Sequence, residues 1–262
     1  MSAHTEEWDF YLTYFADIPA SIIVDLARAK TAPHAELPVR MNVRFLMQTP
    51  REDGLSTNEE RQALDEAEEV LTKAVTGSQS AKFVGRIIHR GIFDLVFYAP
   101  ENSDLDGVLS RLANHLAPYS ADCTVEDDAD WNFFFDILYP SPVENQQIMN
   151  RRVLETLQEH GDSLTQPREV CHWIYFPDSF SRSQFVERIA EGKFEVEESE
   201  SESPEEGEET ARRFGVQLRR QDAVDFSSIN ALVMDLFLTA EECQGEYDGW
   251  ECAVVKDMPE SE

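Results

Sequence analysis

The segment Glu169–Phe176 constrains the fold more than any other stretch, because it is apolar on both of its faces. It reads Glu-Val-Cys-His-Trp-Ile-Tyr-Phe and is followed by Pro177. Alternation along a strand places Val170, His172, Ile174 and Phe176 on one face and Cys171, Trp173 and Tyr175 on the other. A strand of this kind needs a neighbour on each side and a covering layer. We therefore predict an interior strand of a C-terminal sheet.

The segments around this strand predict its neighbours. Further strands are expected at Phe194–Val196, Phe214–Leu218 and Tyr247–Val255, and helices at Gln146–His160, Phe180–Ala190 and Phe226–Ala240. From the central strand onward the order is strand, helix, strand, strand, helix, strand. This is the order of a ferredoxin-like α/β sandwich.

The first half of the chain predicts a separate α+β domain, a mixed sheet with two helices. Its strands are expected at Trp8–Phe15, Ile18–Leu26, Met41–Met47, Phe83–His89, Ile92–Tyr98 and Trp131–Tyr139. Thr57 and Glu60 form a capping box ahead of the amphipathic helix Asn58–Val75, and Asp104 caps a second helix. A turn containing Pro140 and Pro142 ends the pattern, so we expect an α+β protein of two domains, residues 1–142 and 143–262.

The net charge limits the partners of this chain. It has 52 acidic against 22 basic residues, which gives −30 at pH 7. Such a charge repels phosphate backbones and anionic lipid and favours basic partners, so we expect no direct contact with nucleic acid or membrane. No apolar run is long enough to cross a membrane, and Met1–Trp8 lacks a signal-peptide pattern. We expect a cytoplasmic protein, whose oligomeric state stays open.

The most biased segment is Glu195–Glu209, with nine glutamates and no basic residue. Beyond its first few residues it lacks the apolar side chains that could offset the entropy of ordering it, so we expect a mobile acidic loop between two strands. Two interpretations stay open. One is a solubilising insertion, and the other is a polyanionic arm that binds an arginine- or lysine-rich segment of another protein.

Familiar catalytic motifs are missing from the sequence. It contains no dinucleotide or P-loop motif, no zinc-protease or serine-hydrolase motif and no paired redox cysteines. Asp128-x-Asp130-x-Asn132 begins like a calcium loop, but Phe133 stands where that loop needs glycine. A solvated loop is the preferred interpretation. We therefore expect that the protein is not an enzyme and that it binds neither a cofactor nor a metal.

Three residues of the central strand have a functional and a structural interpretation. His172 could act as an acid or base, but on a face shared with apolar side chains a hydrogen-bonded core or sheet-edge histidine is favoured. Trp173 and Tyr175 could stack on a nucleobase, yet the basic residues that flank such aromatics are missing. Core packing is the favoured interpretation for both.

The C-terminal half contains Leu154-x-x-Leu157, Gly161-Asp162, Val170–Phe176, Phe185 and above all Glu246-Tyr-Asp-Gly-Trp250. Through these residues it resembles the RraB family, named for regulator of ribonuclease activity B. The N-terminal half contains Trp8-x-x-Tyr11, Val84-Gly-Arg86, Phe97-Tyr98, Trp131 and Leu138-Tyr-Pro140. Through these motifs residues 1–142 resemble a family of uncharacterised bacterial domains that is often fused ahead of an RraB-like one.

The RraB resemblance implies an acidic ferredoxin-like protein that binds the endoribonuclease RNase E in its basic, non-catalytic region and lowers its activity on some transcripts. The charge argument points the same way, since a polyanion is drawn to an arginine-rich segment. We predict a non-enzymatic regulator that binds a basic protein segment, with RNase E as the implied partner. The expected contact residues are Glu198, Glu200, Glu202, Glu205, Glu206, Glu208, Glu209, Tyr247, Asp248 and Trp250.

Two alternatives remain at this point. The first is an enzyme or small-ligand binder with a pocket in the N-terminal domain or at the domain interface, and His89, Asp94 or Asp128 as candidate polar groups. The second is mimicry of nucleic acid, in which ordered carboxylates copy the spacing of phosphates. The acidic run looks too mobile for such mimicry, so this alternative ranks last.

Overall fold

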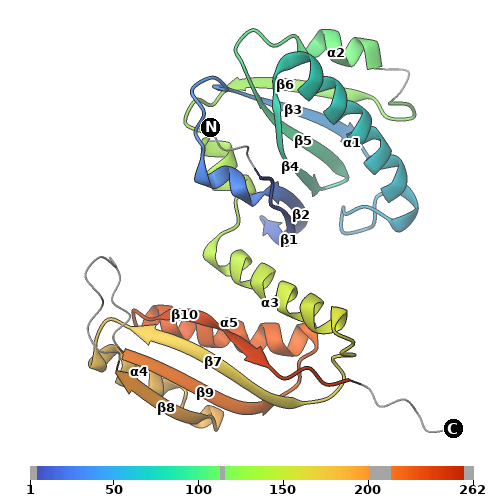
Figure 1. Cartoon of the computed structure of the whole chain (residues 1–262). Helices are drawn as coiled ribbons and strands as arrows, with labels where there is room; N and C mark the ends of the chain where they lie inside the picture. Colours follow the sequence, from blue (N-terminus) through green and yellow to red (C-terminus); the bar gives the residue numbers. More distant parts are fainter. Residues whose placement is uncertain (1–4, 113–115, 201–213, 257–262) are drawn as a thin grey trace, which may run out of the picture. The chain divides into compact units, whose positions relative to one another are not determined.

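The protein folds as two compact units, Met1–Asn145 and Gln146–Glu262, each built around its own β-sheet (Figure 1). The structure is a computed structural model that describes residues 5–112, 116–200 and 214–256. Helix α3 (Pro142–Glu159) starts in the first unit and continues in the second. The predicted α+β class with two domains is confirmed.

The N-terminal sheet has six strands. In spatial order they are β1 (Trp8–Phe15), β2 (Ile18–Asp25), β4 (Lys82–His89), β5 (Ile92–Ala99), β3 (Val39–Leu46) and β6 (Ala121–Asp127). Every neighbouring pair is antiparallel, so the sheet is antiparallel throughout where a mixed sheet was expected. The hairpin turns at Ala16-Asp17 and Arg90-Gly91 have positive φ at both residues, as type I′ turns require.

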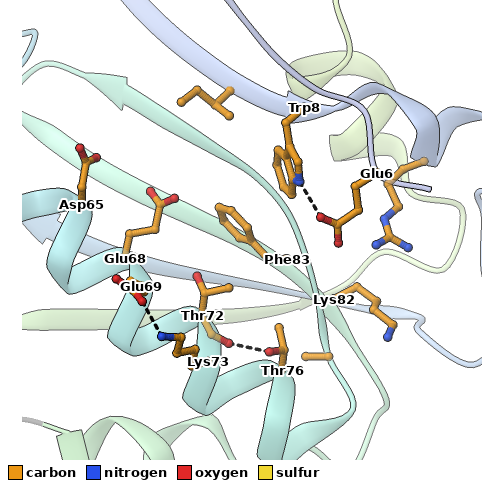
Figure 2. A pocket seen from close by; sticks show the side chains of 13 residues that line it. Glu6, Trp8, Asp65, Glu68, Glu69, Thr72, Lys73, Thr76, Lys82 and Phe83 are labelled. Carbon is orange, nitrogen blue, oxygen red and sulfur yellow. Dashed lines mark hydrogen bonds and ion pairs between the residues drawn. The ribbon is translucent and has the colours of Figure 1, made fainter. Parts of the chain in front are cut away.

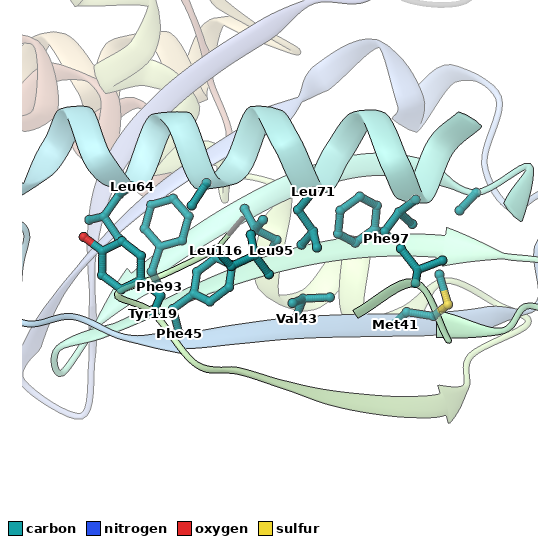
Figure 3. Close-up of a cluster of buried hydrophobic side chains, with 14 of the residues drawn as sticks. Met41, Val43, Phe45, Leu64, Leu71, Phe93, Leu95, Phe97, Leu116 and Tyr119 are labelled. Carbon is teal, nitrogen blue, oxygen red and sulfur yellow. The ribbon is translucent and has the colours of Figure 1, made fainter. Parts of the chain in front are cut away.

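Two helices, α1 (Asn58–Gln79) and α2 (Leu105–Leu112), pack on one face of this sheet and enclose the main hydrophobic core. Figure 3 shows Leu64 and Leu71 of α1 pointing into a layer of sheet side chains that includes Phe93 and Phe97. The predicted cap of α1 is present in part, because the Thr57 hydroxyl accepts the N–H of Glu60 at 3.3 Å.

The Glu60 carboxylate does not complete the capping box. It accepts the backbone N–H groups of Gln48 and Thr49 at 2.5 and 2.8 Å and the Tyr119 hydroxyl at 3.1 Å. Hydrogen bonds of this kind favour the ionised carboxylate, and although burial opposes them, the pKa of Glu60 is lowered. Glu60 thereby fastens the start of α1 to the loop that follows β3.

The prediction of a strand at Trp131–Tyr139 is wrong. Part of the segment forms a short π-helical turn, η2 (Phe134–Leu138), and the sixth strand is instead β6, which the sequence reading missed. The Asp128 carboxylate starts this turn by accepting the N–H groups of Asn132 and Phe133 at 2.8 and 3.1 Å. The aromatic composition favours a strand, but the cap and the packing of the segment favour the turn.

Burial of Trp131, Phe134 and Leu138 follows helical spacing and fixes this segment against the sheet face opposite α1. The indole of Trp131 stacks on Tyr98 with ring centroids 3.9 Å apart. The Tyr11 hydroxyl donates to the carbonyl of Leu138 at 2.9 Å. Both faces of the N-terminal sheet are therefore partly covered, one by helices and the other by this aromatic turn.

The C-terminal sheet has four antiparallel strands in the order β10 (Glu246–Cys252), β7 (Arg168–Phe176), β9 (Phe214–Asp222) and β8 (Glu195–Glu200). Helices α4 (Ser179–Arg188) and α5 (Phe226–Glu242) lie on one side of it (Figure 1). This is the ferredoxin-like arrangement predicted from the element order. The prediction of β7 as an interior strand is confirmed, since β10 and β9 flank it.

The two faces of β7 meet different surroundings. Val170, His172, Ile174 and Phe176 are buried, and the ring of Phe176 contacts that of Phe185 in α4 at 5.2 Å. Cys171, Trp173 and Tyr175 alternate with them and are partly exposed, on the face opposite α4 and α5. The expectation of core packing for Trp173 and Tyr175 is therefore wrong.

Candidate functional site

The predicted acidic contact residues fall only partly within the described structure. Glu198 and Glu200 belong to β8, and Glu200 is its last residue. Glu202, Glu205, Glu206, Glu208 and Glu209, and with them most of the expected mobile loop, lie outside the described residues. The part of the acidic run that the structure does describe is a strand rather than a loop.

Strand β8 places carboxylates on both faces of a sheet edge. Glu195, Glu197 and Glu198 are all exposed, and among the strands that the structure describes β8 pairs only with β9. An Arg182 Nη of α4 lies 2.8 Å from the Glu198 carboxylate, and an Arg219 Nη lies 3.2 Å from that of Glu197. Charged edge strands discourage pairing between sheets, and an exposed row of carboxylates also attracts cations.

The motif Glu246-Tyr-Asp-Gly-Trp250 forms β10 and contributes mainly to the core. Tyr247 and Trp250 are each 7% exposed. The Tyr247 hydroxyl lies 2.8 Å from Nδ1 of His172, and Nε1 of Trp250 donates to Asn150 of α3 at 3.0 Å. The two aromatic side chains are thus placed for packing rather than for surface contact, and of the three predicted contact residues here only Asp248 is exposed.

His172 is a core histidine, as its apolar neighbours predicted. Its exposure is 0%, and its Nε2 is buried without a hydrogen-bond partner among the described residues. Burial, with a smaller contribution from Arg220, lowers its pKa to about 4, although Asp222 opposes the shift. The ring is therefore neutral near pH 7 and closed to a substrate.

The three candidate polar groups of the alternative prediction each have a structural partner. Nδ1 of His89 lies 3.0 Å from the carbonyl of Pro19. Asp94 accepts from Asn42 at 2.9 Å and from Arg44 at 2.8 Å, and burial raises its pKa. Asp128 accepts the Tyr98 hydroxyl in addition to the two N–H groups of its helical turn.

The segment Asp128-x-Asp130-x-Asn132, which begins like a calcium loop, therefore caps a helical turn through the Asp128 carboxylate. Within residues 5–112, 116–200 and 214–256, no three histidine, cysteine or carboxylate side chains are grouped to hold a metal ion. Over the same ranges no helix combines the length and the apolarity needed to span a membrane.

A groove of about 630 Å³ lies on the N-terminal unit between the β1–β2 hairpin and helix α1 (Figure 2). Its aromatic wall is Trp8 stacked on Phe83, with ring centroids 5.2 Å apart. The Trp8 Nε1 donates to Glu6 at 2.9 Å, and Trp8 as a residue remains 37% exposed. Neither His89, Asp94 nor Asp128 lines this groove. The alternative prediction expected a pocket in this domain or at the domain interface, but it named none of the residues that line the groove; Trp8, an aromatic residue at the start of a predicted strand, was the available signal.

Polar groups of α1 form the opposite wall. The Glu68 carboxylate accepts from Arg86 at 2.7 Å, but burial outweighs this attraction and raises the pKa of Glu68. The Thr72 hydroxyl is buried and, within the described residues, has no hydrogen-bond partner. Lys73 pairs with Glu69 at the rim. An aromatic wall facing a few polar groups is typical of small-ligand sites.

In a comparison with known proteins, each half of the chain matches a family model. Residues 6–139 match the model of the family of unknown function DUF695, and residues 147–252 match the model described as Regulator of ribonuclease activity B. The curated proteins include no match. Among solved structures, the crystal structure of an unknown protein from Galdieria sulphuraria is 14% identical, covering 80% of this chain and 95% of that one with a TM-score of 0.22.

Proposed function

Since this chain belongs to the DUF695 family by residues 6–139 and joins to it a domain of the Regulator of ribonuclease activity B family, we propose that it is a non-enzymatic regulator of a ribonuclease. It acts by binding protein rather than RNA, because a net charge of −30 repels a phosphate backbone. The partner is an endoribonuclease of the RNase E type, contacted through a basic segment, in the cytoplasm. Residues 143–262 form the regulatory domain and residues 1–142 a separate one.

The observation that carries this proposal is the row of exposed carboxylates on β8. Glu195, Glu197 and Glu198 stand on the outermost strand of the sheet, and the acidic sequence continues from there to Glu209. A basic polypeptide gains charge-assisted hydrogen bonds along such a row and is steered toward it over a distance of about 8 Å at physiological salt. Asp248, exposed on the opposite edge strand, is the second proposed contact region.

Two existing ion pairs set the energetics of this contact. Because Arg182 and Arg219 already lie beside Glu198 and Glu197, an incoming arginine has to share or displace them. The Arg219–Glu197 pair is exposed and contributes only about 0–1 kcal/mol, so exchanging it costs little. The Arg182 side chain is only 9% exposed, so an incoming arginine shares Glu198 with it rather than displacing it. The proposed binding energy therefore comes from the combined electrostatic attraction of the carboxylates on β8 rather than from any single one of them.

The test is a pull-down of the full chain by an RNase E basic segment at rising salt. We expect binding that weakens steeply with salt, and weaker binding at every salt for a variant with Glu195, Glu197 and Glu198 all changed to Gln. The matched control changes Glu52, Glu59 and Glu66 to Gln, three exposed acids of the N-terminal unit, and alters the net charge equally. Binding that ignores salt, or that both variants weaken equally, would contradict the contact at β8.

A second candidate function rests on the groove beside α1. An accessible aromatic pair next to a partly buried carboxyl with a raised pKa favours a small-ligand site in the N-terminal unit. Native mass spectrometry of the full chain purified from cell extract should then detect a retained small molecule. Trp8→Ser should release it, and the control Phe180→Ser, at an exposed aromatic of the C-terminal unit, should keep it. Wild-type protein that carries no added mass would remove this candidate.

A further inference from the structure

The C-terminal sheet has an open face, defined here as the side opposite α4 and α5. Strand alternation and the pairing register assign residues to it. They are Glu169, Cys171, Trp173 and Tyr175 of β7, Gly215, Gln217 and Arg219 of β9, Glu195, Glu197 and Ser199 of β8, and Glu246, Gly249 and Glu251 of β10. Aromatic side chains thus stand in the middle of the open face, and carboxylates stand on both of its edge strands.

Trp173 stands beside an uncovered position on this face. Its cross-strand neighbour on β10 is Gly249, which has φ +141° and follows the register shift of the strand. A Cβ built on Gly249 would meet no atom within 4 Å, so no other group covers the sheet surface at this position; we call this uncovered position the hollow. Tyr175 differs, because its ring already lies 3.4 Å from the equivalent position on Gly215.

Two carboxylates bracket the hollow. Glu246 pairs with Tyr175 and Glu251 with Cys171, which places them one step on either side of Trp173 on the same face. Such diagonal neighbours in a sheet stand roughly 7–8 Å apart at Cα, within reach of one long side chain. Both glutamates are exposed, and Trp173 is partly exposed.

Arg219 does not occupy this hollow. It stands across from Cys171 on β9, but its Nη2 donates to Gln217 at 2.8 Å and to Glu197 at 3.2 Å, toward β8. By strand register, Trp173 therefore has Gly249 directly across and two carboxylates diagonally across on β10, and a neutral amide, Gln217, directly across on β9.

We propose that the Trp173–Gly249 hollow, with Glu246 and Glu251 at its rim, binds an arginine side chain of an extended polypeptide partner. A guanidinium can stack on an indole face and at the same time donate two N–H groups to one carboxylate, and no other side chain combines these two interactions. Glycine at 249 leaves room for the guanidinium to lie beside the ring. The proposal rests on the proposed function, since it says where the basic segment would dock.

The chemistry of this face favours an arginine-bearing peptide over single-stranded RNA, although both stack on aromatic rings. RNA would bring phosphates toward the carboxylates of Glu195, Glu197, Glu246 and Glu251, whereas sheets that bind RNA present basic residues beside their aromatics. Charge complementarity therefore selects the cationic ligand.

The hollow also explains the sequence Glu246-Tyr-Asp-Gly-Trp250 as a unit. Tyr247 and Trp250 anchor the strand in the core, Gly249 opens the surface, and Glu246 contributes charge on the open face. Tyr247 and Trp250 face the helices, whereas Glu246 and Gly249 lie on the open face of the sheet. A surface role for this motif therefore needs no exposure of its aromatic side chains.

The experiment measures binding of the full chain to a labelled synthetic peptide of alternating arginine and glycine by fluorescence anisotropy. Trp173→Leu keeps apolar bulk but removes the π face and should weaken binding by roughly 3- to 30-fold. Glu251→Gln should weaken it less. A peptide with lysine in place of arginine should bind the wild type more weakly and respond less to Trp173→Leu.

Matched controls separate the hollow from general effects. Tyr14→Leu and Glu59→Gln, both at exposed positions of the N-terminal unit, should bind the arginine peptide as the wild type does. Amide hydrogen exchange of β7 should be unchanged in Trp173→Leu, which shows that the sheet is intact. If Trp173→Leu folds but binds normally, or if the wild type does not bind the peptide, the proposal is wrong.

The same titrations with an RNase E basic segment and with single-stranded RNA separate this proposal from the proposed function. Binding to the RNase E segment that is indifferent to Trp173 would leave the regulator proposal standing and overturn the hollow. If the arginine peptide binds in a Trp173-dependent way but the RNase E segment does not bind, the hollow stands and the regulator proposal is overturned. RNA binding that depends on Trp173 would overturn the choice of an arginine ligand.

Discussion

Changing Asp162 to Asn should destabilise the C-terminal unit by about 2–4 kcal/mol at pH 7. The Asp162 side chain is buried, and its carboxylate binds the guanidinium of Arg168, itself only 6% exposed, with one contact at 2.9 Å. It also accepts the N–H groups of Leu164 at 2.8 Å and of Val255 at 2.7 Å. One side chain therefore ties the end of α3, the start of β7 and the segment after β10 together.

The magnitude follows from the pKa of Asp162. The hydrogen bond from Arg168, supported by the two backbone N–H groups, lowers this pKa from the ordinary 3.8 to about 2. At about 1.36 kcal/mol per pKa unit this corresponds to about 2.4 kcal/mol of stability. Asn keeps the shape but leaves Arg168 buried without its counter-charge, and breaking a buried pair in this way costs about 3–5 kcal/mol in other proteins.

The pH dependence has a definite sign. The folded-state pKa is lowered, so the contribution of Asp162 is fully present above the unfolded-state pKa of about 3.9 and is lost as pH falls toward about 2. Roughly half of the difference between wild type and Asp162→Asn should remain at pH 3. The other carboxylates titrate in both proteins and largely cancel from this difference.

Hydrogen exchange of peptides from β7, followed against denaturant, reports the opening of the C-terminal unit separately from that of the N-terminal one. Glu251→Gln, at an exposed carboxylate of the same sheet, is the control and should change the free energy by less than about 0.5 kcal/mol. A loss below about 1 kcal/mol for Asp162→Asn, or a loss that stays constant from pH 7 to pH 3, would refute the reasoning.

Two further predictions concern the cores of the two units. Burial lowers the pKa of His172 to about 4, so below about pH 6.5 the unfolded state takes up a proton that the folded state does not. The free energy of unfolding should therefore decline by roughly 2 kcal/mol between neutral pH and pH 5. Exchange of β7 peptides should show this decline in the wild type, and His172→Gln should remove most of it; an unchanged slope would assign it to another group. Trp131→Ala should cost about 3–5 kcal/mol in the N-terminal unit, because the buried indole stacks on Tyr98. Exchange should rise in β5 peptides but not in β7, and a rise in both would mean that the units do not unfold independently.

Local patterns predicted most of the elements. Period-two alternation identified β7, and helical spacing after the cap at Thr57 identified α1. The strands expected at Phe83–His89 and Ile92–Tyr98 correspond to β4 and β5. These signals are readable because backbone geometry and side-chain direction repeat at short range, whatever the rest of the chain does.

The errors occur where a segment has two permissible local structures. Trp131–Tyr139 has the composition of a strand, and its packing against Tyr98 together with the cap from Asp128 selects a helical turn. Tyr247 and Trp250 were expected at the surface, but their hydrogen bonds to His172 and Asn150 hold them in the core. The partners that decide each case are remote in sequence.

Periodicity, element order and charge are properties of the chain alone, and they sufficed to predict the two α+β domains, the ferredoxin-like order of the second and the acidic character of its surface. Which side of β7 the helices cover, and so whether Trp173 is core or surface, depends on how distant segments pack. Alternation divides a strand into two faces but does not say which one is covered. The register with β10 then brought Gly249 and its neighbouring carboxylates beside that tryptophan, a juxtaposition of residues more than seventy positions apart that no local pattern specifies.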